Sequence, residues 1–125
     1  MALNVRLKRI YDEPAPEDGL RVLVDRLWPR GVSRETARID AWMKEVAPSD
    51  ELRRWFGHDP ERWSEFRRRY REELLNKRDL IEQLHHAAEQ GALTLLFAAR
   101  NSQQNNAVVL KEAVESLMNK GVLKS

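Results

Sequence analysis

The sequence has 125 residues, a length that suits one domain, and we expect residues 1–125 to form it. Charged residues make up 34% and apolar residues 42%, a balance that excludes a disordered chain and predicts a globular, soluble protein. The net charge of +2 does not indicate a uniformly basic nucleic-acid-binding protein. With no cysteine, the chain has no disulfide, thiolate nucleophile, iron–sulfur cluster or thiolate zinc site.

The N-terminal segment Met1 to Arg9 carries Arg6, Lys8 and Arg9 and lacks the apolar core of a signal peptide. No run approaches the roughly 20 apolar residues of a membrane span. We therefore expect neither export nor membrane insertion, and a cytoplasmic location.

Three segments predict β-strands. Residues 3–7 alternate apolar and polar side chains, as in an outer strand with one buried face. Residues 20–25 begin as a continuous apolar run with β-branched members, and residues 93–99 are almost wholly apolar, so both predict strands buried on two faces. The segment Arg38 to Met43 fits a strand or a helix, and the residues alone leave the choice open.

Capping residues and apolar stripes predict the helices. Ser33 suits the start of a short helical turn, and Ser49 a helix ending at Gly57. Asp59 with Pro60 predicts the start of the next helix, whose stripe is Trp63, Phe66, Tyr70 and Leu74. A further helix carries Leu80 to Ala88 and stops at Gly91; a last one follows the polar loop 101–106, with Ala107, Leu110, Val114 and Leu117 inward and an end at Gly121.

This order of elements predicts a three-layer α/β domain: a mainly parallel sheet of three or four strands with helices packed over it. Ligands of such sheets bind at the carboxyl ends of the strands, where helix N-termini also point. Polar residues gather there after both buried strands. The predicted ligand-binding residues are Asp25, Arg26, Trp28, Arg30, Arg100, Asn101 and Asn105.

Arg26, Arg30 and Arg100 would neutralise the charge of a phosphate or carboxylate, Asn101 and Asn105 would hydrogen-bond to it, and Trp28 would stack on it. The equally weighted alternative is structural: Asp25 pairs with one or two of the arginines and braces the loop. The two alternatives stay open at this point.

Other polar groups have ordinary interpretations. The arginines at 67, 68, 69 and 71 form a basic run, but the i,i+4 pairs Glu65–Arg69, Arg68–Glu72 and Arg69–Glu73 predict a solvated, self-neutralised face. His85 and His86 are adjacent, so they cannot share a metal ion as an i,i+4 pair does, and a solvated face is expected. His58, in a loop near the strand ends, is a weak candidate for a general base. No glycine motif for a nucleotide or hydrolase site is present, and we expect no metal and no cofactor.

Three stretches, "RVLVDRLWPRG", "APSDELRRWFGHDPERWSEFRRRYREEL" and "LTLLFAARNSQQNNAVVLKE", resemble the bacterial YeaO-like family, domain of unknown function 488, and the match runs in the same order over nearly the whole chain. The resemblance implies a small, soluble α/β protein. In the broader group a strand end of the type Asp-x-Arg with a nearby proline recurs, which Asp25, Arg26 and Pro29 resemble with altered spacing. The segment after it is typically strand-like, which favours a strand at Arg38 to Met43. The family offers no catalytic residues to carry over.

The favoured function is binding of a small anionic or phosphorylated ligand at the strand ends, with turnover left open. The alternative is a nucleic-acid or protein interaction module that uses the arginine-rich helix and the isoelectric point of about 9.1. The sequence fixes neither a substrate nor an oligomeric state.

Overall fold

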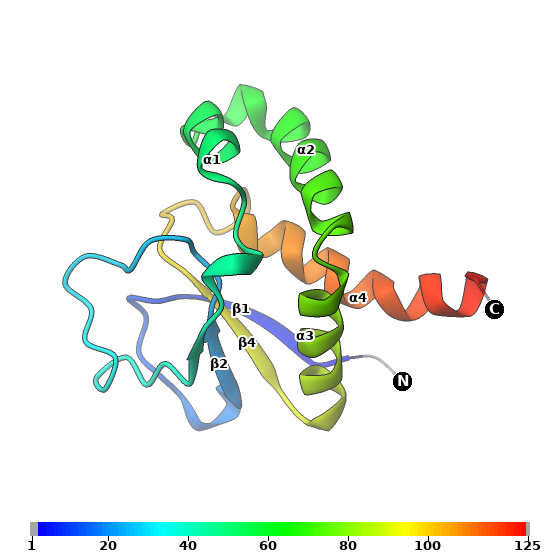
Figure 1. Cartoon of the computed structure of the whole chain (residues 1–125). Coiled ribbons are helices and arrows are strands. Elements are labelled where there is room, and N and C mark those ends of the chain that lie inside the picture. Colours follow the sequence, from blue (N-terminus) through cyan, green and yellow to red (C-terminus); the bar gives the residue numbers. More distant parts are fainter. Residues whose placement is uncertain (1–2, 125) are drawn as a thin grey trace.

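The computed structural model describes the backbone of residues 3–124 and the side chains of residues 3–116 (Figure 1). The strands are β1 Val5–Arg9, β2 Leu20–Leu23, β3 Ala41–Trp42 and β4 Leu93–Phe97. The helices are α1 Asp50–Phe56, α2 Trp63–Leu75, α3 Arg78–Gln90 and α4 Asn106–Lys124. Short 3-10 turns lie at Pro16–Asp18, Lys44–Val46 and Pro60–Arg62.

The four strands form one parallel sheet in the order β1-β4-β2-β3. Leu95 of β4 is aligned with Leu7 of β1 and with Val22 of β2. Every residue of β4 is buried, which confirms the prediction of a central strand, and β1 lies at the edge as expected. The fold class predicted from the sequence, a parallel α/β sheet covered by helices, is confirmed.

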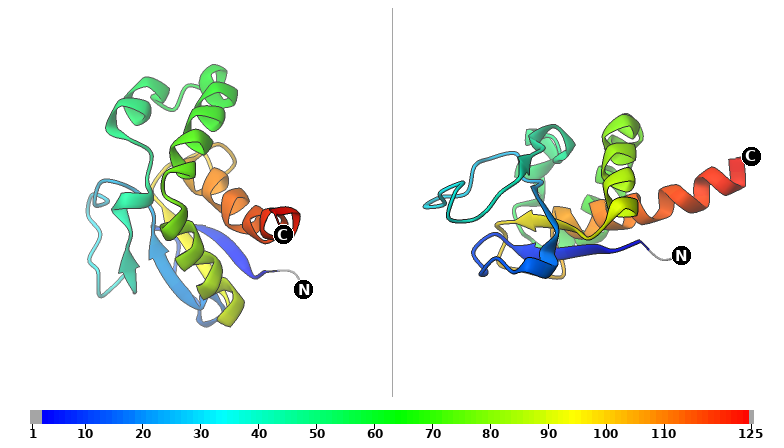
Figure 2. Two further views of the ribbon diagram at one scale, coloured as in Figure 1. Left: turned by 45° about the vertical axis from the view of Figure 1, so that its right-hand side comes forward. Right: turned by 90° about the horizontal axis from the view of Figure 1, so that it is seen from below.

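The two faces of the sheet are covered differently. Because side chains alternate along a strand, Val22 and Leu95 share one face and Leu23 and Leu96 the other. On the first face the apolar side chains of all four helices form one cluster with Val22, Leu95 and their neighbours. On the second face, Leu23 and Leu96 pack under connecting segments instead of helices, against Ile10, Ala37 and Ile39. The third layer of the domain is therefore a folded loop (Figures 1 and 2).

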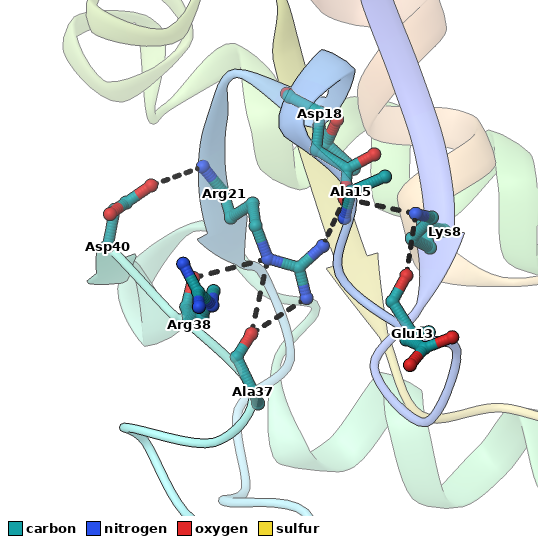
Figure 3. Close-up of polar contacts among 9 residues, drawn as sticks. Lys8, Glu13, Ala15, Asp18, Arg21, Ala37, Arg38 and Asp40 are labelled. Atoms are coloured by element: carbon teal, nitrogen blue, oxygen red, sulfur yellow. Dashed lines mark hydrogen bonds and ion pairs between the residues drawn. The ribbon is translucent and has the colours of Figure 1, made fainter.

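A buried arginine holds this loop layer. Arg21 in β2 is 3% exposed, and its guanidinium donates to the Asp18 carboxylate at 2.5 Å and to the Ala37 carbonyl at 2.8 Å (Figure 3). Its Nε also donates to the Arg38 carbonyl at 3.2 Å. Asp40 accepts from the Arg21 backbone N–H at 2.8 Å, so the loop is attached to β2 by backbone and side chain alike.

The ambiguous segment Arg38 to Met43 contains β3 at Ala41–Trp42, so the strand interpretation is confirmed for these two residues. Arg38 itself has a φ of 52° and lies in the loop layer. Ser33 begins a turn over residues 34–38, where no helix forms. The expected end of the last helix at Gly121 is wrong, because α4 continues to Lys124; the direction of Leu117 lies outside the described side chains.

Helix ends follow the predicted chemistry. The Ser49 hydroxyl accepts from the Leu52 N–H at 3.1 Å, and Gly57 with a φ of 52° ends α1. Asp59 caps the turn Pro60–Arg62, which runs directly into α2. Stacking of Phe56 on Phe66, with ring centroids 4.2 Å apart, then fixes the end of α1 against α2.

The chain diverges after the two central strands. The segment after β2 enters the loop layer on one face, whereas β4 leads into α4, which packs on the helical face. Such a divergence between neighbouring parallel strands leaves a crevice at their carboxyl ends.

Candidate functional site

A cavity of about 710 Å³ opens at the carboxyl ends of β2 and β4. Its walls are the segment that follows β2, the end of α1 with the next turn, and the connection from β4 to α4. The structure places all seven ligand-binding residues predicted from the sequence in this wall: Asp25, Arg26, Trp28, Arg30, Arg100, Asn101 and Asn105. Their hydrogen bonds divide them into groups that shape the cavity and groups that are available to a ligand.

Asp25 is half-buried at the inner end of the cavity and is held by neutral donors. The Ala98 N–H donates to its Oδ2 at 2.9 Å, and the Asn106 amide donates to its Oδ1 at 3.1 Å. Burial raises the pKa of Asp25 above its ordinary value, although these two donors and the nearby His58 oppose the rise. Within the described residues no arginine is hydrogen-bonded to Asp25, so of the two alternatives left open by the sequence the Asp25–arginine brace is not the one observed.

Arg26 points away from Asp25 towards the start of α1. Its Nε donates to the Pro48 carbonyl at 3.0 Å and its Nη2 to the Ala47 carbonyl at 3.3 Å, while Asp50 lies 3.9 Å from Nε. The Ala47 carbonyl also accepts from the Lys77 ammonium at 2.8 Å. Arg26 therefore fixes the segment that leads into α1, which forms the opposite wall of the cavity.

Trp28 is committed to packing. Its Nε1 donates to the Val32 carbonyl at 2.9 Å, and its ring meets the Trp42 ring edge-on with centroids 5.3 Å apart. Both rings pack against the cluster of the loop layer. Trp28 thus lines the cavity and also packs on the apolar cluster of the loop layer.

The two asparagines build the loop between β4 and α4. Asn101 Oδ1 accepts from the Gln103 and Gln104 N–H groups at 2.9 and 3.0 Å. Asn105, which is 2% exposed, caps α4 by accepting from the Val108 N–H at 3.1 Å and donates to the Asn101 carbonyl at 2.8 Å. Both side-chain oxygens therefore serve the loop rather than facing a ligand.

Arg30 and Arg100 remain available. Both side chains are exposed in the cavity wall, and among the described residues neither makes a side-chain hydrogen bond or an ion pair. The backbone of Arg30 is held in place, since the Tyr11 hydroxyl donates to its carbonyl at 3.0 Å. A guanidinium with all its donors free suits bidentate contact with an oxyanion.

The structure adds three residues that the site prediction omitted. Arg53 and Arg54, at the end of α1, line the cavity opposite the strand ends. Arg53 donates from Nη2 to the Asp50 carboxylate at 3.3 Å, while its buried Nε has no hydrogen-bond partner in the described part of the chain. The side chain of the exposed Arg54 makes no hydrogen bond or ion pair there. His58, noted from the sequence only as a weak general-base candidate, also lines the cavity. In the sequence, Arg53 and Arg54 stand in the last turn of the helix predicted to end at Gly57. Only the packing of α1 shows that their side chains face the cavity.

His58 has a φ of 59°, in the left-handed region that non-glycine residues seldom adopt. It follows Gly57, whose φ is 52°, so two left-handed residues in succession turn the chain sharply after α1. The turn leaves the imidazole exposed at the cavity, 6.1 Å from the Phe56 ring centroid.

The arginine-rich helix is largely neutralised, as predicted. Glu65 binds both Arg68 and Arg69 at 2.7 and 2.8 Å, and these hydrogen bonds lower the pKa of Glu65 to about 2. Arg68 also pairs with Glu72 at 2.6 Å. The expected partner of Arg69 at position 73 is instead used by α1, because Glu73 accepts from the Ser49 hydroxyl at 2.6 Å.

The histidine pair of α3 divides between two environments. His86 is exposed as expected, but the prediction for His85 is wrong: its Nδ1 lies 3.0 Å from the Val114 carbonyl at the contact with α4. Among the described residues no group of three or more histidine, aspartate or glutamate side chains is placed to hold a metal ion. None of the described helices has the length and apolar character required to span a bilayer.

Comparisons with known proteins match nearly the whole chain. A family model described as "Inactive DUF488-N3 subclade" matches residues 4–122. The uncharacterised protein YeaO of Escherichia coli K12 is 41% identical over 115 residues, which cover 92% of this chain and all of that protein. An uncharacterised protein of Mycobacterium tuberculosis H37Rv is 44% identical over 109 residues, 87% of this chain and 92% of the relative. No solved structure gives a significant match.

Proposed function

Because this chain belongs to the YeaO-like DUF488 family, whose matched relatives are named uncharacterised, we propose a function from the cavity itself: the protein binds a small anionic or phosphorylated ligand at the carboxyl ends of β2 and β4.

The observation that carries the proposal is the charge of the cavity wall. Five arginines line it, Arg26, Arg30, Arg53, Arg54 and Arg100, against the single carboxylate of Asp25. That carboxylate is occupied by the Ala98 N–H and the Asn106 amide. Like charges gathered around a concave surface raise the local concentration of an oppositely charged ligand. Asp50 lies 3.9 Å from Arg26 and 3.3 Å from Arg53, so an anion would supply the counter-charge of the other three arginines.

The arginines of the cavity wall have different roles. Arg30, Arg54 and Arg100 have free guanidinium groups and are the proposed ligand contacts. Arg26 holds the approach to α1 through the carbonyls of Ala47 and Pro48, and so positions the wall that carries Arg54. The cavity also lies beside the N-terminus of α4, where backbone N–H groups and the helix dipole favour negative charge.

Binding without turnover is the form of this function that we favour. The description of the matching family model contains the word "Inactive". Asp25, the only carboxylate of the cavity wall, is engaged with two structural donors, which leaves it poorly placed to move a substrate proton.

A thermal-shift titration with inorganic phosphate and with sulfate tests the proposal. A ligand at 100 times its Kd adds about 2.7 kcal/mol of stability, so a rise in Tm is expected for the wild type. Arg30→Ala and Arg100→Ala should each reduce the shift while their Tm without ligand stays near that of the wild type. The control is Arg34→Ala, an exposed arginine outside the cavity. Equal shifts in all three variants would place the anion elsewhere, and the absence of any shift with phosphate, sulfate or organic phosphates would overturn the proposal.

The nucleic-acid alternative has less support, because Glu65 and Glu72 neutralise the arginine-rich helix. We therefore expect no shift of DNA or RNA in an electrophoretic-mobility titration at low salt. Binding that weakens steeply with salt and is lost in Arg68→Ala would favour the alternative instead.

A further inference from the structure

The rim of the cavity carries apolar side chains as well as cations. Within the described part of the chain four large apolar side chains are exposed, and two of them, Tyr11 at 49% and Leu27 at 58%, line this cavity. Leu27 lies between Arg26 and Trp28, in a segment whose neighbouring side chains are all held by hydrogen bonds or packing. An exposed leucine beside a cavity offers apolar surface that a ligand can cover.

The aromatic side chains of this wall belong mainly to the core. Phe56 and Phe66, which stack on each other, line the cavity but are only 6% and 2% exposed, and Pro48 is buried. The apolar surface that a ligand can cover is therefore that of Leu27 and Tyr11.

The size of the cavity agrees with a larger ligand. Its volume of about 710 Å³ falls within the range of about 300–1,000 Å³ that pockets for organic ligands occupy. The free cations approach it from separate segments: Arg30 after β2, Arg54 at the end of α1 and Arg100 after β4. Such a wall can hold the charged end of a molecule whose other end meets Leu27.

We infer that the ligand of this cavity is a phosphorylated molecule that carries an apolar ring, of about the size of a mononucleotide, with its phosphate on the free arginines and its ring against the exposed Leu27. The inference rests on the proposed anion binding and adds the class of ligand. Arginine planes next to apolar surface also suit a flat ring, because a guanidinium stacks on aromatic faces.

The test compares ligands that share the phosphate and differ in the ring. Isothermal titration uses the four nucleoside 5′-monophosphates, glycerol phosphate and inorganic phosphate. At least one ring-bearing phosphate should bind about tenfold more tightly than glycerol phosphate, since covering one leucine side chain is worth a factor of this order. Leu27→Ala should reduce that ratio to near one. The matched control is Leu75→Ala, which removes a leucine of similar exposure, 66% against 58%, that does not line the cavity.

Each outcome bears on a different claim. If the ring phosphates and glycerol phosphate bind equally, or if Leu27→Ala leaves the ratio unchanged, the ring contact is wrong while anion binding stands. If none of the phosphates binds, anion binding fails and the ring contact fails with it. Preference for one ring phosphate that depends on both Leu27 and Arg100 supports the inference.

Discussion

Two aspartates flank β2 and are stabilised in opposite ways. Asp18, just before the strand, is 3% exposed and binds Arg21 at 2.5 Å and Lys8 at 3.0 Å. Asp25, just after the strand, accepts from the neutral donors of Ala98 and Asn106, and no cation is hydrogen-bonded to it among the described residues. Burial raises the pKa of either carboxyl. At Asp18 the Ala15 N–H and the two cations outweigh burial and lower the pKa, whereas at Asp25 burial prevails.

The comparison explains why the cavity stays cationic. At the amino end of β2 the buried arginine is fully used, by the Asp18 carboxylate and by two carbonyls of the loop layer. At the carboxyl end Asp25 draws on amide donors, so Arg30 and Arg100 keep their charge available to the cavity. One end of the strand is a structural lock and the other is an open site.

Removing the cation of the lock should have the largest effect. Arg21→Ala leaves Asp18 buried without its closest partner and frees the Ala37 and Arg38 carbonyls. We expect a loss of about 3–5 kcal/mol in the free energy of unfolding, measured by urea denaturation. The exposed Arg34→Ala should stay within about 0.5 kcal/mol of the wild type. A loss below about 1 kcal/mol for Arg21→Ala would contradict the buried lock.

Changing each aspartate to asparagine tests the comparison directly. Asp18→Asn removes the negative charge that faces Arg21 and Lys8 and should cost about 2–3 kcal/mol at pH 7. Asp25→Asn keeps an acceptor for the Ala98 N–H, and the Asn106 amide keeps its bond to the Val24 carbonyl, so only the bond between residues 25 and 106 is lost and the cost should be about 1 kcal/mol. Urea midpoints of the two variants in one buffer give the difference. Equal losses would mean that charge does not distinguish the two sites.

Arg26→Ala lies between these extremes. The change removes two charge-assisted hydrogen bonds to the Ala47 and Pro48 carbonyls of a partly exposed side chain, and should cost about 1–2 kcal/mol. Because Arg26 does not bind Asp25, the double variant with Asp25→Asn should lose at least as much. Recovery of stability in the double variant, measured as a double-mutant cycle, would restore the Asp25 brace that the hydrogen bonds argue against.

The pH dependence should be the smallest effect, since one group changes stability by at most about 1.4 kcal/mol per pH unit. Asp18 has a lowered pKa, so its contribution is present above the ordinary value of 3.8 and is lost as the pH falls through the folded-state pKa. Asp25 has a raised pKa, so its contribution to stability is present below the ordinary value of 3.8 and is lost as the pH rises through the folded-state pKa. Unfolding curves from pH 2 to 7 should therefore show a shallower acid loss in Asp18→Asn than in the wild type, and a steeper one in Asp25→Asn. The same slope in all three proteins would show that neither carboxyl is perturbed.

Sequence patterns were sufficient where a local rule controls the structure. The apolar runs predicted β2 and β4, Ser49 and Gly57 bounded α1, and the mixture of strands and helices predicted a mainly parallel sheet of three or four strands. The strand at Ala41–Trp42 was decided by family resemblance, because its pattern fits both periods and only two residues pair with β2. The end of α4 was missed because Gly121 lies within a helix that continues past it.

The site was predictable as a location and only partly as chemistry. Residues at the ends of neighbouring parallel strands must lie close together, so Asp25 and Arg100 could be placed in one cavity from the sequence. The partners of Asp25 and Arg26 could not, because they include the backbone groups of Ala98, Ala47 and Pro48, and any residue type presents such groups. Arg54 was missed since its direction depends on how α1 packs on α2.

The position of β4 in the sheet also has a consequence for synthesis of the chain on the ribosome. β1 and β2 are separated by about ten residues of sequence, yet each pairs with β4 and not with the other. β2 can pair with the two residues of β3 early, but Leu93–Phe97 must emerge from the exit tunnel before β1 finds its partner and before the second edge of β2 is paired. Until then β1 is unpaired, while the β2–β3 pair and the helices α1 to α3 can form from segments already made. Folding of the sheet is in this sense a late event, completed almost as the last helix is made.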